Sequence, residues 1–341
     1  MQEEREPLIS VVVPAYQVEE YLESCITSVC GQEYSNIEIL LVYKKSQDRT
    51  AELCGELAER DCRIHAMECS AGGVSASRNM ALAAAKGEYI AFVDADDYVE
   101  KDYLRQLCQN MDKCDISICG FDRIRPDSAR EELLGADRYY ERDELLADIL
   151  CSNVVGGYLW NKLFQGSVIR EQKLRFQEEL SVGEDMCFIV SYVKQIQKGR
   201  YCNRILYHYR INQHSALQKM YTTGVFDKGK LSNMQAAQRI AELLADAGPE
   251  VEKAVSYRIV RTDMWTLFNL LKCRYYDKEL LKLLQKSIRE RRREYCRNDN
   301  ARIVEKISCT LFSICPILFW KTAVLLLKLL PQWIIRRYVY C

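Results

Sequence analysis

The stretch Gly87-Glu88-Tyr89-Ile90-Ala91-Phe92-Val93-Asp94-Ala95-Asp96-Asp97 decides the fold of this chain. Its centre, residues 89–93, is a short run of apolar, aromatic and β-branched side chains, which predicts a buried strand. The strand runs directly into acidic residues. Because the acidic residues directly follow the strand, we expect their side chains to face a ligand crevice at the strand end.

Similar strands precede this one, and helix-length segments separate them. The strands are predicted at 9–13, 37–42 and 64–67, and the helices at 21–29, 50–60 and 74–85. This alternation predicts a parallel sheet with helices on both faces. Farther along, residues 121–140 are expected to be a loose polar stretch, and helices are expected at 143–150, from Gly183 onward and throughout 219–298.

Ligands of open parallel sheets bind beyond the carboxyl ends of the strands, so the residues that follow each strand are the candidates. They are Pro14-Ala15-Tyr16, Tyr43-Lys44-Lys45-Ser46, Ala71-Gly72-Gly73 and Asp94-Ala95-Asp96-Asp97. Carboxylates one residue apart, as in Asp94 and Asp96, suit Mg²⁺ or Mn²⁺ shared with a diphosphate. The alternative is an acidic turn that caps a helix from Tyr98.

Composition narrows the classes of function. The 341 residues include 48 Lys plus Arg and 48 Asp plus Glu, and this balance argues against a nucleic-acid partner. The 16 cysteines form no Cys-x-x-Cys pair, and the chain opens with a charged stretch, Met1-Gln2-Glu3-Glu4-Arg5-Glu6, without an apolar leader. We therefore expect reduced thiols and a cytoplasmic protein.

Several ordered motifs resemble family 2 glycosyltransferases, which have the GT-A fold. They are Val11-Val12-Val13-Pro14-Ala15-Tyr16, Gly72-Gly73-Val74-Ser75-Ala76-Ser77-Arg78-Asn79, residues 87–97, Trp160-Asn161-Lys162-Leu163-Phe164, Gly183-Glu184-Asp185 and Tyr207-His208-Tyr209-Arg210. The resemblance implies a Rossmann-like α/β domain with a mixed, mostly parallel sheet. Its donor half would be residues 1–120 and its acceptor half 121–218, followed by a helical region, 219–305, and a basic apolar segment, 306–341.

The resemblance also implies roles for single residues. The donor side would comprise Pro14, Ala15, Tyr16, Tyr43, Arg78, Asp94, Ala95 and Asp96. Asp96, with Asp94 and His214, would hold Mn²⁺ or Mg²⁺, and the ion would stabilise the departing diphosphate. For Arg78 the alternative is a surface salt bridge.

On the acceptor side, Asp185 matches the base that takes the proton from the attacking hydroxyl in an inverting transfer, with Glu184 as an acceptor contact or substitute base. The alternative is an acidic first turn that the helix dipole favours. Trp160 would stack on a sugar ring and Lys162 would meet a hydroxyl or a lipid-linked phosphate, although Trp160 is equally compatible with the core. His208 is expected to be structural.

One motif departs from the family pattern. After the second strand the family usually has two acidic residues and a glycine before serine, whereas this chain has Tyr43-Lys44-Lys45-Ser46. Lysines cannot make the hydrogen bonds of carboxylates. Two readings remain: Tyr43 and a lysine contact an altered donor, or the chain is a catalytically impaired, membrane-tethered sugar-nucleotide-binding or scaffold protein.

The C-terminal segment differs chemically from the rest. Residues 306–341 contain five basic residues and no acidic one, so the remainder of the neutral chain carries −5. None of its apolar runs reaches the roughly 20 residues of a membrane-spanning helix. We expect it to lie on an anionic membrane surface, with a core or homo-oligomer interface as the alternative.

Together these expectations describe an inverting, metal-dependent glycosyltransferase, peripheral on the inner face of the cell membrane. It would transfer a sugar from a nucleotide-sugar donor, a UDP-sugar, to a glycan or polyprenyl-linked acceptor. The resemblance points to the synthesis of capsule, exopolysaccharide or lipopolysaccharide.

Overall fold

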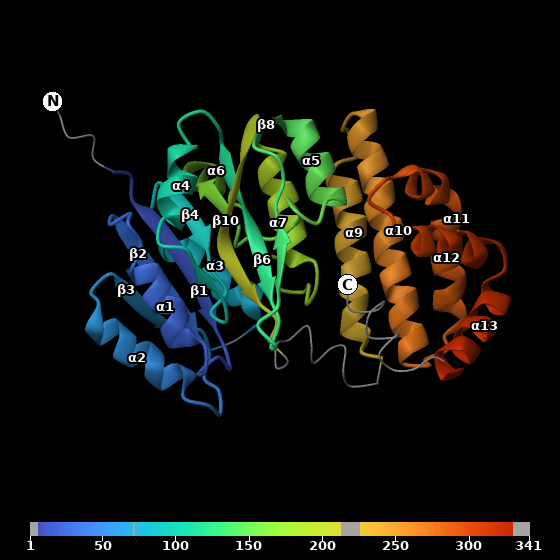
Figure 1. The fold of residues 1–341 in the computed structure, drawn as a ribbon, viewed down its shortest axis with the longest axis horizontal. Coiled ribbons are helices and arrows are strands. Elements are labelled where there is room, and N and C mark those ends of the chain that lie inside the picture. The colour runs from blue at the N-terminus through green and yellow to red at the C-terminus, as the bar shows by residue number, and fades with distance from the viewer. Residues whose placement is uncertain (1–5, 71, 213–225, 330–341) are drawn as a thin grey trace. The chain divides into compact units, whose positions relative to one another are not determined.

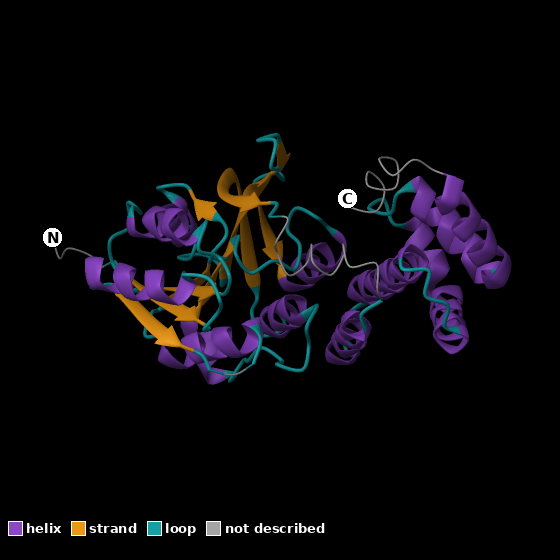
Figure 2. Cartoon of the chain, turned by 90° about the horizontal axis from the view of Figure 1, so that it is seen from below, coloured by secondary structure: helices purple, strands orange, loops and turns teal. Residues whose placement is uncertain are grey.

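The computed structural model describes residues 6–70, 72–212 and 226–329. The chain divides into two compact units with a boundary between Asn212 and Gln213. The first unit combines a sheet with helices, whereas the described part of the second contains helices only (Figure 1, Figure 2).

The first half of the sheet confirms the predicted alternation. Its strands run parallel in the order β3-β2-β1-β4, and Ile9 of β1 lies opposite Ile37 of β2 and Tyr89 of β4. The elements are β1 (Ile9–Ala15), α1 (Leu22–Cys30), β2 (Ile37–Tyr43), α2 (Thr50–Arg60), β3 (Ile64–Glu68), α3 (Val74–Ala84) and β4 (Tyr89–Phe92). Each lies within two residues of its predicted bounds.

The second half of the sheet is mixed, which corrects two expectations. Beyond β4 the order continues β9-β6-β10-β5, and β9 is antiparallel to both of its neighbours. Among the described strands, five pairs are antiparallel and four are parallel. The sheet is mixed, as expected, but the expectation that it is mostly parallel holds only for the part β3-β2-β1-β4. The strands are β5 (Tyr98–Val99), β6 (Ile116–Ile124), β7 (Arg130–Leu133), β8 (Arg138–Glu141), β9 (Lys162–Gln165) and β10 (Lys198–Arg210).

The stretch 121–140 is therefore not an irregular loop. The end of β6 pairs with β7, and β8 pairs with β10. Most residues of β7 and β8 are exposed, so these strands lack the apolar alternation that identifies a buried strand. The strand β7 forms a local hairpin with β6, whereas the partner of β8 is distant in the sequence.

A buried polar pair ties the first strands to the turn before β4. Ser10 Oγ donates to Glu38 Oε1 at 2.5 Å, and Glu38 also accepts from the backbone N–H of Lys86 at 2.7 Å. Gly87 N–H donates to Ser10 Oγ at 2.8 Å. A Cβ on Gly87 would lie 2.5 Å from Ser10 N, so only glycine fits this close approach.

Helices pack against this sheet, and one of them presents the predicted acidic pair. They are α4 (Tyr103–Gln109), α5 (Arg142–Cys151), α6 (Gly166–Glu171) and α7 (Glu184–Val193). Gly183 precedes α7 with φ of 91°, a conformation that side chains disfavour. This turn places Glu184 and Asp185 in the first turn of α7.

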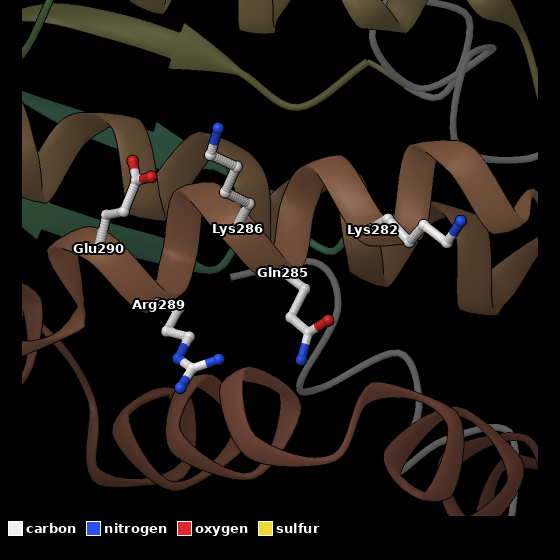
Figure 3. A pocket seen from close by; sticks show the side chains of 5 residues that line it. All are labelled: Lys282, Gln285, Lys286, Arg289 and Glu290. Carbon is white, nitrogen blue, oxygen red and sulfur yellow. The ribbon is translucent and has the colours of Figure 1, made fainter.

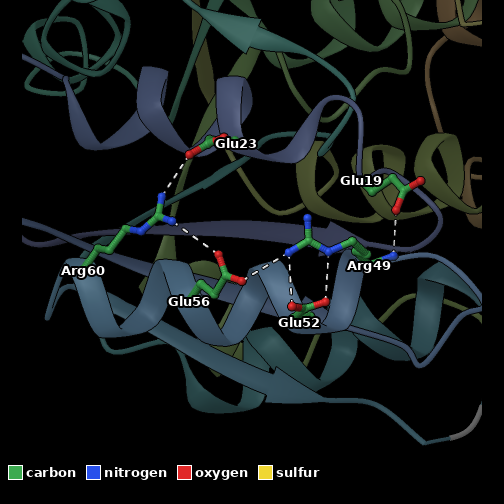
Figure 4. A network of polar contacts seen from close by, with 6 residues as sticks. All are labelled: Glu19, Glu23, Arg49, Glu52, Glu56 and Arg60. Atoms are coloured by element: carbon green, nitrogen blue, oxygen red, sulfur yellow. Dashed lines mark hydrogen bonds and ion pairs between the residues drawn. The ribbon is translucent and has the colours of Figure 1, made fainter.

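The outer surface of α2 carries a network of charged side chains (Figure 4). Arg60 pairs with Glu23 of α1 at 2.9 Å, and Arg49 pairs with Glu52 at the same distance. Exposed pairs of this kind contribute little to stability. They therefore mark the solvent face of α2 rather than a site.

The second unit begins, in its described part, with a 3₁₀ turn, η1 (Lys228–Leu231). The helices that follow are α9 (Ser232–Leu243), α10 (Pro249–Lys272), α11 (Lys278–Arg297), α12 (Ile303–Ile314) and α13 (Pro316–Leu329). The helix α12 ends at Ile314 and α13 begins at Pro316, because proline after Cys315 prevents one continuous helix. Within the described residues, no helix is both long and apolar enough to cross a bilayer.

Candidate active site

The carboxyl ends of β2, β1 and β4 lie next to one another, because β1 pairs in parallel with both of the others. The residues that follow these strands are Lys44, Tyr16 and Asp94. Tyr16 is 53% exposed, whereas Ala15 and Ala95 are nearly fully buried. The predicted crevice thus has one exposed aromatic ring, and the two alanines can offer a ligand little beyond backbone groups.

Arg78 of α3 joins three carboxylates from two other parts of the unit. Its Nη1 donates to Asp185 Oδ1 at 2.6 Å and to Glu184 Oε1 at 3.2 Å, while Nη2 donates to Asp94 Oδ1 at 3.3 Å. Only 5% of the Arg78 side chain is exposed. The surface salt bridge considered from the sequence is therefore excluded, since the guanidinium lies inside the carboxylate cluster.

The cluster perturbs its own acid–base behaviour. Burial, followed by the charge of Glu184, raises the pKa of Asp185 to about 8, although Arg78 opposes this shift. Burial also raises the pKa of Asp94, again against the effect of Arg78. The Asp185 side chain nevertheless remains 29% exposed, so a substrate can reach it. A carboxyl group with a pKa near neutrality is suited to proton transfer.

Asp96 and Asp97 have different surroundings. Burial, then the charge of Asp94, raises the pKa of Asp96 to about 6. Asp97 is fully buried and accepts from Tyr207 Oη at 2.7 Å and from Arg210 N–H at 2.8 Å. Asp97 therefore anchors the motif to β10, and Asp96 is left with the more accessible carboxylate.

Sequence reasoning assigned no role to Tyr207, although it lies within a quoted motif. Its hydroxyl donates to Asp97 and accepts from Asp94 N–H at 3.1 Å. Asn79 is a second residue that reasoning missed: it exchanges two hydrogen bonds, 2.8 and 2.9 Å long, with the backbone of Phe176. The Phe176 ring lies 5.4 Å from the Arg78 guanidinium. These contacts position the cluster.

The loop that departs from the family pattern is held by its own contacts. Lys44 Nζ donates to Gly72 C=O at 3.2 Å and lies 6.0 Å from the centre of the Tyr16 ring. Lys45 instead pairs with Glu68 at 3.2 Å, and its side chain is 77% exposed. Tyr43, at the end of β2, is partly buried. Lys44 is thus the lysine that borders the crevice.

The two expected acceptor residues are both buried. Trp160 is 5% exposed and stacks on Tyr207 with the ring centres 4.4 Å apart. Trp160 also stacks on Tyr158, with the ring centres 4.9 Å apart. These contacts favour a role for Trp160 in the hydrophobic core rather than in acceptor binding. It also supports Tyr207, which holds Asp97.

Lys162 differs most from expectation. It is fully buried, and its Nζ donates to the carbonyl oxygens of Val155, Gly156 and Tyr158 and to Asn161 Oδ1, at distances from 2.7 to 3.0 Å. Burial lowers its pKa to about 7. With four oxygen partners already in place, Lys162 organises the loop before β9, and its amine does not reach an acceptor.

The remaining predicted residues are either structural or not described. His208 is buried between Asp122 at 2.8 Å and Glu100 at 3.0 Å, as expected for a structural histidine. His214 lies outside the described residues. The part of the chain that the structure describes holds no group of three or more His, Cys, Asp or Glu side chains arranged around a metal position.

The chain is similar to known proteins in sequence and in fold. The glycosyl transferase family 2 model matches residues 10–167. The uncharacterized glycosyltransferase EpsJ of Bacillus subtilis (strain 168) is 32% identical over 221 residues, which cover 63% of this chain and 64% of EpsJ. This chain thus spans just under two thirds of the length of EpsJ.

Two solved structures are similar over most of their length. S. aureus TarS 1-349 in complex with UDP-GlcNAc superposes with a TM-score of 0.68 at 18% identity, covering 93% of this chain and 90% of that one. The mannosyltransferase PcManGT from Pyrobaculum calidifontis, in complex with GDP-Man and Mn²⁺, has a TM-score of 0.52 at 14% identity, with coverages of 92% and 88%.

The first unit, with its mixed sheet and flanking helices, has a GT-A-like α/β fold. Residues 10–167 match the glycosyl transferase family 2 model, and the chain is similar in sequence to bacterial glycosyltransferases such as EpsJ.

Proposed function

We propose that the protein is an inverting glycosyltransferase that moves a sugar from a nucleotide-sugar donor, a UDP-sugar, to a glycan or polyprenyl-linked acceptor in cell-surface polysaccharide synthesis. One observation carries the proposal. Arg78 brings the donor-side carboxylate Asp94 and the candidate base Asp185 to a single cation. A site for transfer needs both groups around one reacting centre.

The donor would lie across the ends of β2, β1 and β4. Neighbouring strands are about 4.8 Å apart, so this row spans about 10 Å. Asp94 and Asp96 at one end would face the diphosphate, while Tyr16 and Lys44 at the other would face the nucleoside. Tyr43 is proposed as a further contact at that end. Similarity to TarS and PcManGT, which were solved with nucleotide sugars, supports this class of donor.

Asp94 and Asp96 fit a divalent ion, Mn²⁺ or Mg²⁺. Hard carboxylate oxygens suit these ions, and burial raises the pKa of both groups because it disfavours their charged forms, which a bound cation would favour. When bound, the ion would supply positive charge for the departing diphosphate. His214, which lies outside the described residues, is proposed as a third ligand of this ion.

Asp185 would take the proton of the acceptor hydroxyl. It lies in the first turn of α7, partly exposed, and Glu184 stands beside it as an acceptor contact. Before the transfer, Arg78 offsets part of the negative charge of the Asp185 carboxylate, and that charge is lost when the carboxylate takes the proton. The acceptor contacts proposed for Trp160 and Lys162 receive little support, because both side chains are buried.

A second candidate function rests on the loop Tyr43-Lys44-Lys45. Both lysines already have partners, Gly72 and Glu68, without any ligand. A protein that binds nucleotide sugar but no longer turns it over, and acts as a membrane-tethered scaffold, would be compatible with such a loop.

One experiment separates the two functions. Purified protein is titrated with UDP-sugars and Mn²⁺, and donor consumption is followed with and without acceptor extracts. Ion-dependent consumption that Asp96→Asn and Asp185→Asn abolish supports the transferase. Binding without consumption supports the scaffold, and no binding of any UDP-sugar contradicts both functions as proposed here. The variant Glu52→Gln, which changes an exposed residue of α2, is purified and assayed in the same way and should behave as wild type does.

A further inference from the structure

The end of the second unit exposes a row of large apolar side chains. We name it the C-terminal apolar strip: Ile303, Val304, Ile307, Leu311, Ile314, Ile317 and Leu318. Each of these residues is between 54% and 76% exposed. Steps of three and four residues keep most of them on one side of α12, and the row continues past the break at Cys315 onto α13.

The other side of α12 is already occupied. Cys309 and Phe312 are fully buried, and Ser313 is 2% exposed. Gln285 of α11 donates to Ser313 C=O at 3.2 Å, and Arg292 donates to Ser313 Oγ at 3.1 Å. Since α11 fixes this side of the helix, α12 cannot turn to hide the strip within its unit without breaking these contacts.

Positive charge borders the strip. Arg302 and Lys321, near its two ends, are exposed. Glu305 is the single acidic residue of α12, and its carboxylate accepts from Arg302 N–H at 3.0 Å and from Tyr295 Oη at 3.3 Å. From Lys306 onward the sequence contains no Asp or Glu.

A second group of basic side chains lies along α11. Lys282, Lys286 and Arg289 line an open hollow of about 320 Å³ together with Gln285 and Glu290 (Figure 3). Gln285 and Arg289 point from α11 toward the helices that follow it, and Gln285 contacts α12. Among the described residues, neither Lys286 nor Arg289 forms an ion pair.

We propose that the C-terminal apolar strip docks on the surface of a lipid bilayer that contains anionic phospholipid, and that Arg302 and Lys321 beside it contact the headgroups. Exposed apolar residues bordered by cations are typical of helices that lie in the membrane interface. Contiguous exposed apolar residues rimmed by polar ones mark interaction sites with proteins or membranes.

Charge argues against the chief alternative, a second copy of the chain. A symmetric contact through the strip would bring two basic borders together, with no carboxylate from Lys306 onward to compensate. An anionic bilayer complements the same border. The proposal goes beyond the proposed function and does not depend on it, because lipid binding is measured without donor or acceptor.

The test uses the full chain and sedimentation with vesicles. Two compositions are compared: phosphatidylcholine alone, and phosphatidylcholine with about 30% phosphatidylglycerol. We expect wild type to sediment with the anionic vesicles, with an affinity that falls as salt rises, and to bind the neutral vesicles at least about tenfold more weakly.

Two variants divide the contributions. Ile307→Ser/Leu311→Ser/Ile314→Ser should reduce binding to anionic vesicles by about tenfold or more. Arg302→Gln/Lys321→Gln should weaken it and flatten its salt dependence. The matched controls, Leu134→Ser and Lys101→Gln in the first unit, replace exposed residues and should bind as wild type does. All five positions of the two variants are exposed, so folding should persist, and equal circular dichroism melting curves check this.

Three outcomes would overturn the proposal. The first is a wild-type chain that sediments with neither vesicle. The second is binding that the serine variant leaves unchanged but a chain ending at residue 329 loses, which would assign the lipid contact to the last segment. The third is a dimer in solution that the serine variant converts to a monomer without any lipid binding, which would identify the strip as an interface between copies.

Discussion

Arg78 and Asp185 are 107 residues apart in the sequence, yet Arg78 Nη1 lies 2.6 Å from Asp185 Oδ1. The same guanidinium holds Asp94, which follows β4. One side chain therefore connects the strand that presents the donor-side carboxylate with the helix that presents the candidate base. Changes at Arg78 should affect both parts.

Arg78→Met should destabilise the protein strongly, because it leaves three carboxylates without their common cation. Removing one partner of a buried ion pair typically costs about 3 to 5 kcal/mol. Without the cation the carboxylate pKa values rise further, so stability falls as pH rises, and the loss should be larger at pH 8 than at pH 5. Urea unfolding at the two pH values measures it.

The matched control is Arg60→Met. Arg60 also contacts two carboxylates, Glu23 and Glu56, but its side chain is 58% exposed. We expect a change below about 1 kcal/mol that does not depend on pH. An equal loss in both variants would contradict the central position of Arg78.

Turnover should increase with pH through about 8. Because burial raises the pKa of Asp185 to about 8, the carboxyl group is protonated below that pH and cannot accept the hydroxyl proton. Rates at saturating donor, measured from about pH 6 to about pH 9, should rise and then level off. Asp185→Asn should retain donor binding but lose turnover, and a flat profile in the wild type would speak against Asp185 as the base.

Asp96→Asn should have opposite effects on binding and on stability. The ion-dependent affinity for nucleotide should fall by at least about tenfold, because one oxygen ligand loses its charge. With chelator present, the variant should instead be more stable than wild type by about 1 to 3 kcal/mol at pH 8.

The sign follows from the pKa. Asp96 has a pKa of about 6 in the folded protein, above the roughly 3.9 of an unfolded chain. The folded state thus holds its proton more tightly, and the ionised wild type loses stability as pH rises from about 4 to about 6. Thermal melting at pH 4 and pH 8 measures the difference, and a variant that melts below wild type at pH 8 would contradict it.

Lys44→Met should weaken nucleotide binding, whereas Lys45→Met should not. Lys44 lies beside the exposed Tyr16 ring, but Lys45 is directed to Glu68 of β3. We expect about a fivefold loss of UDP affinity, or about 1 kcal/mol, for Lys44→Met. Calorimetric titration with UDP and Mn²⁺ measures both variants, and equal affinities would remove Lys44 from the donor site.

Lys162→Met should destabilise the fold without a separate effect on the acceptor. The substitution leaves four oxygen acceptors without their donor, which should cost about 3 kcal/mol or more. Urea unfolding measures this, with Lys101→Met as the exposed control. A variant as stable as wild type but with a raised KM for acceptor would restore Lys162 as an acceptor contact.

The hydrophobic pattern of the sequence predicted the first half of the sheet, where strands and helices alternate along the chain. The strands β1, β2 and β4 are apolar runs that end at charged or turn-forming residues, so their bounds follow from the sequence. The strands β7 and β8 could not be found in this way. Both are mostly exposed and rich in charged residues, so they lack the apolar pattern of a buried strand. In addition, β8 pairs with β10, about 60 residues further along the chain, whereas β7 forms a local hairpin with β6.

The same limit applied to the site. Motif resemblance indicated Arg78, Asp94 and Asp185, but a single sequence does not show that one guanidinium binds all the carboxylates. Lys162 looked available because nothing in the sequence marks the carbonyl groups of residues 155, 156 and 158 as its partners. Contacts to backbone atoms leave no trace in residue types.

The link between Asp97 and β10 sets an order for biosynthesis. Asp97 is held by Tyr207 and Arg210, which follow it by 110 and 113 residues. During translation the sheet β1 to β4 is complete long before Tyr207 leaves the ribosome. A nascent chain can therefore contain the whole acidic motif and still have no ordered site. The acidic motif would therefore become ordered only after β10, the last strand of the first unit, has been synthesised and has paired.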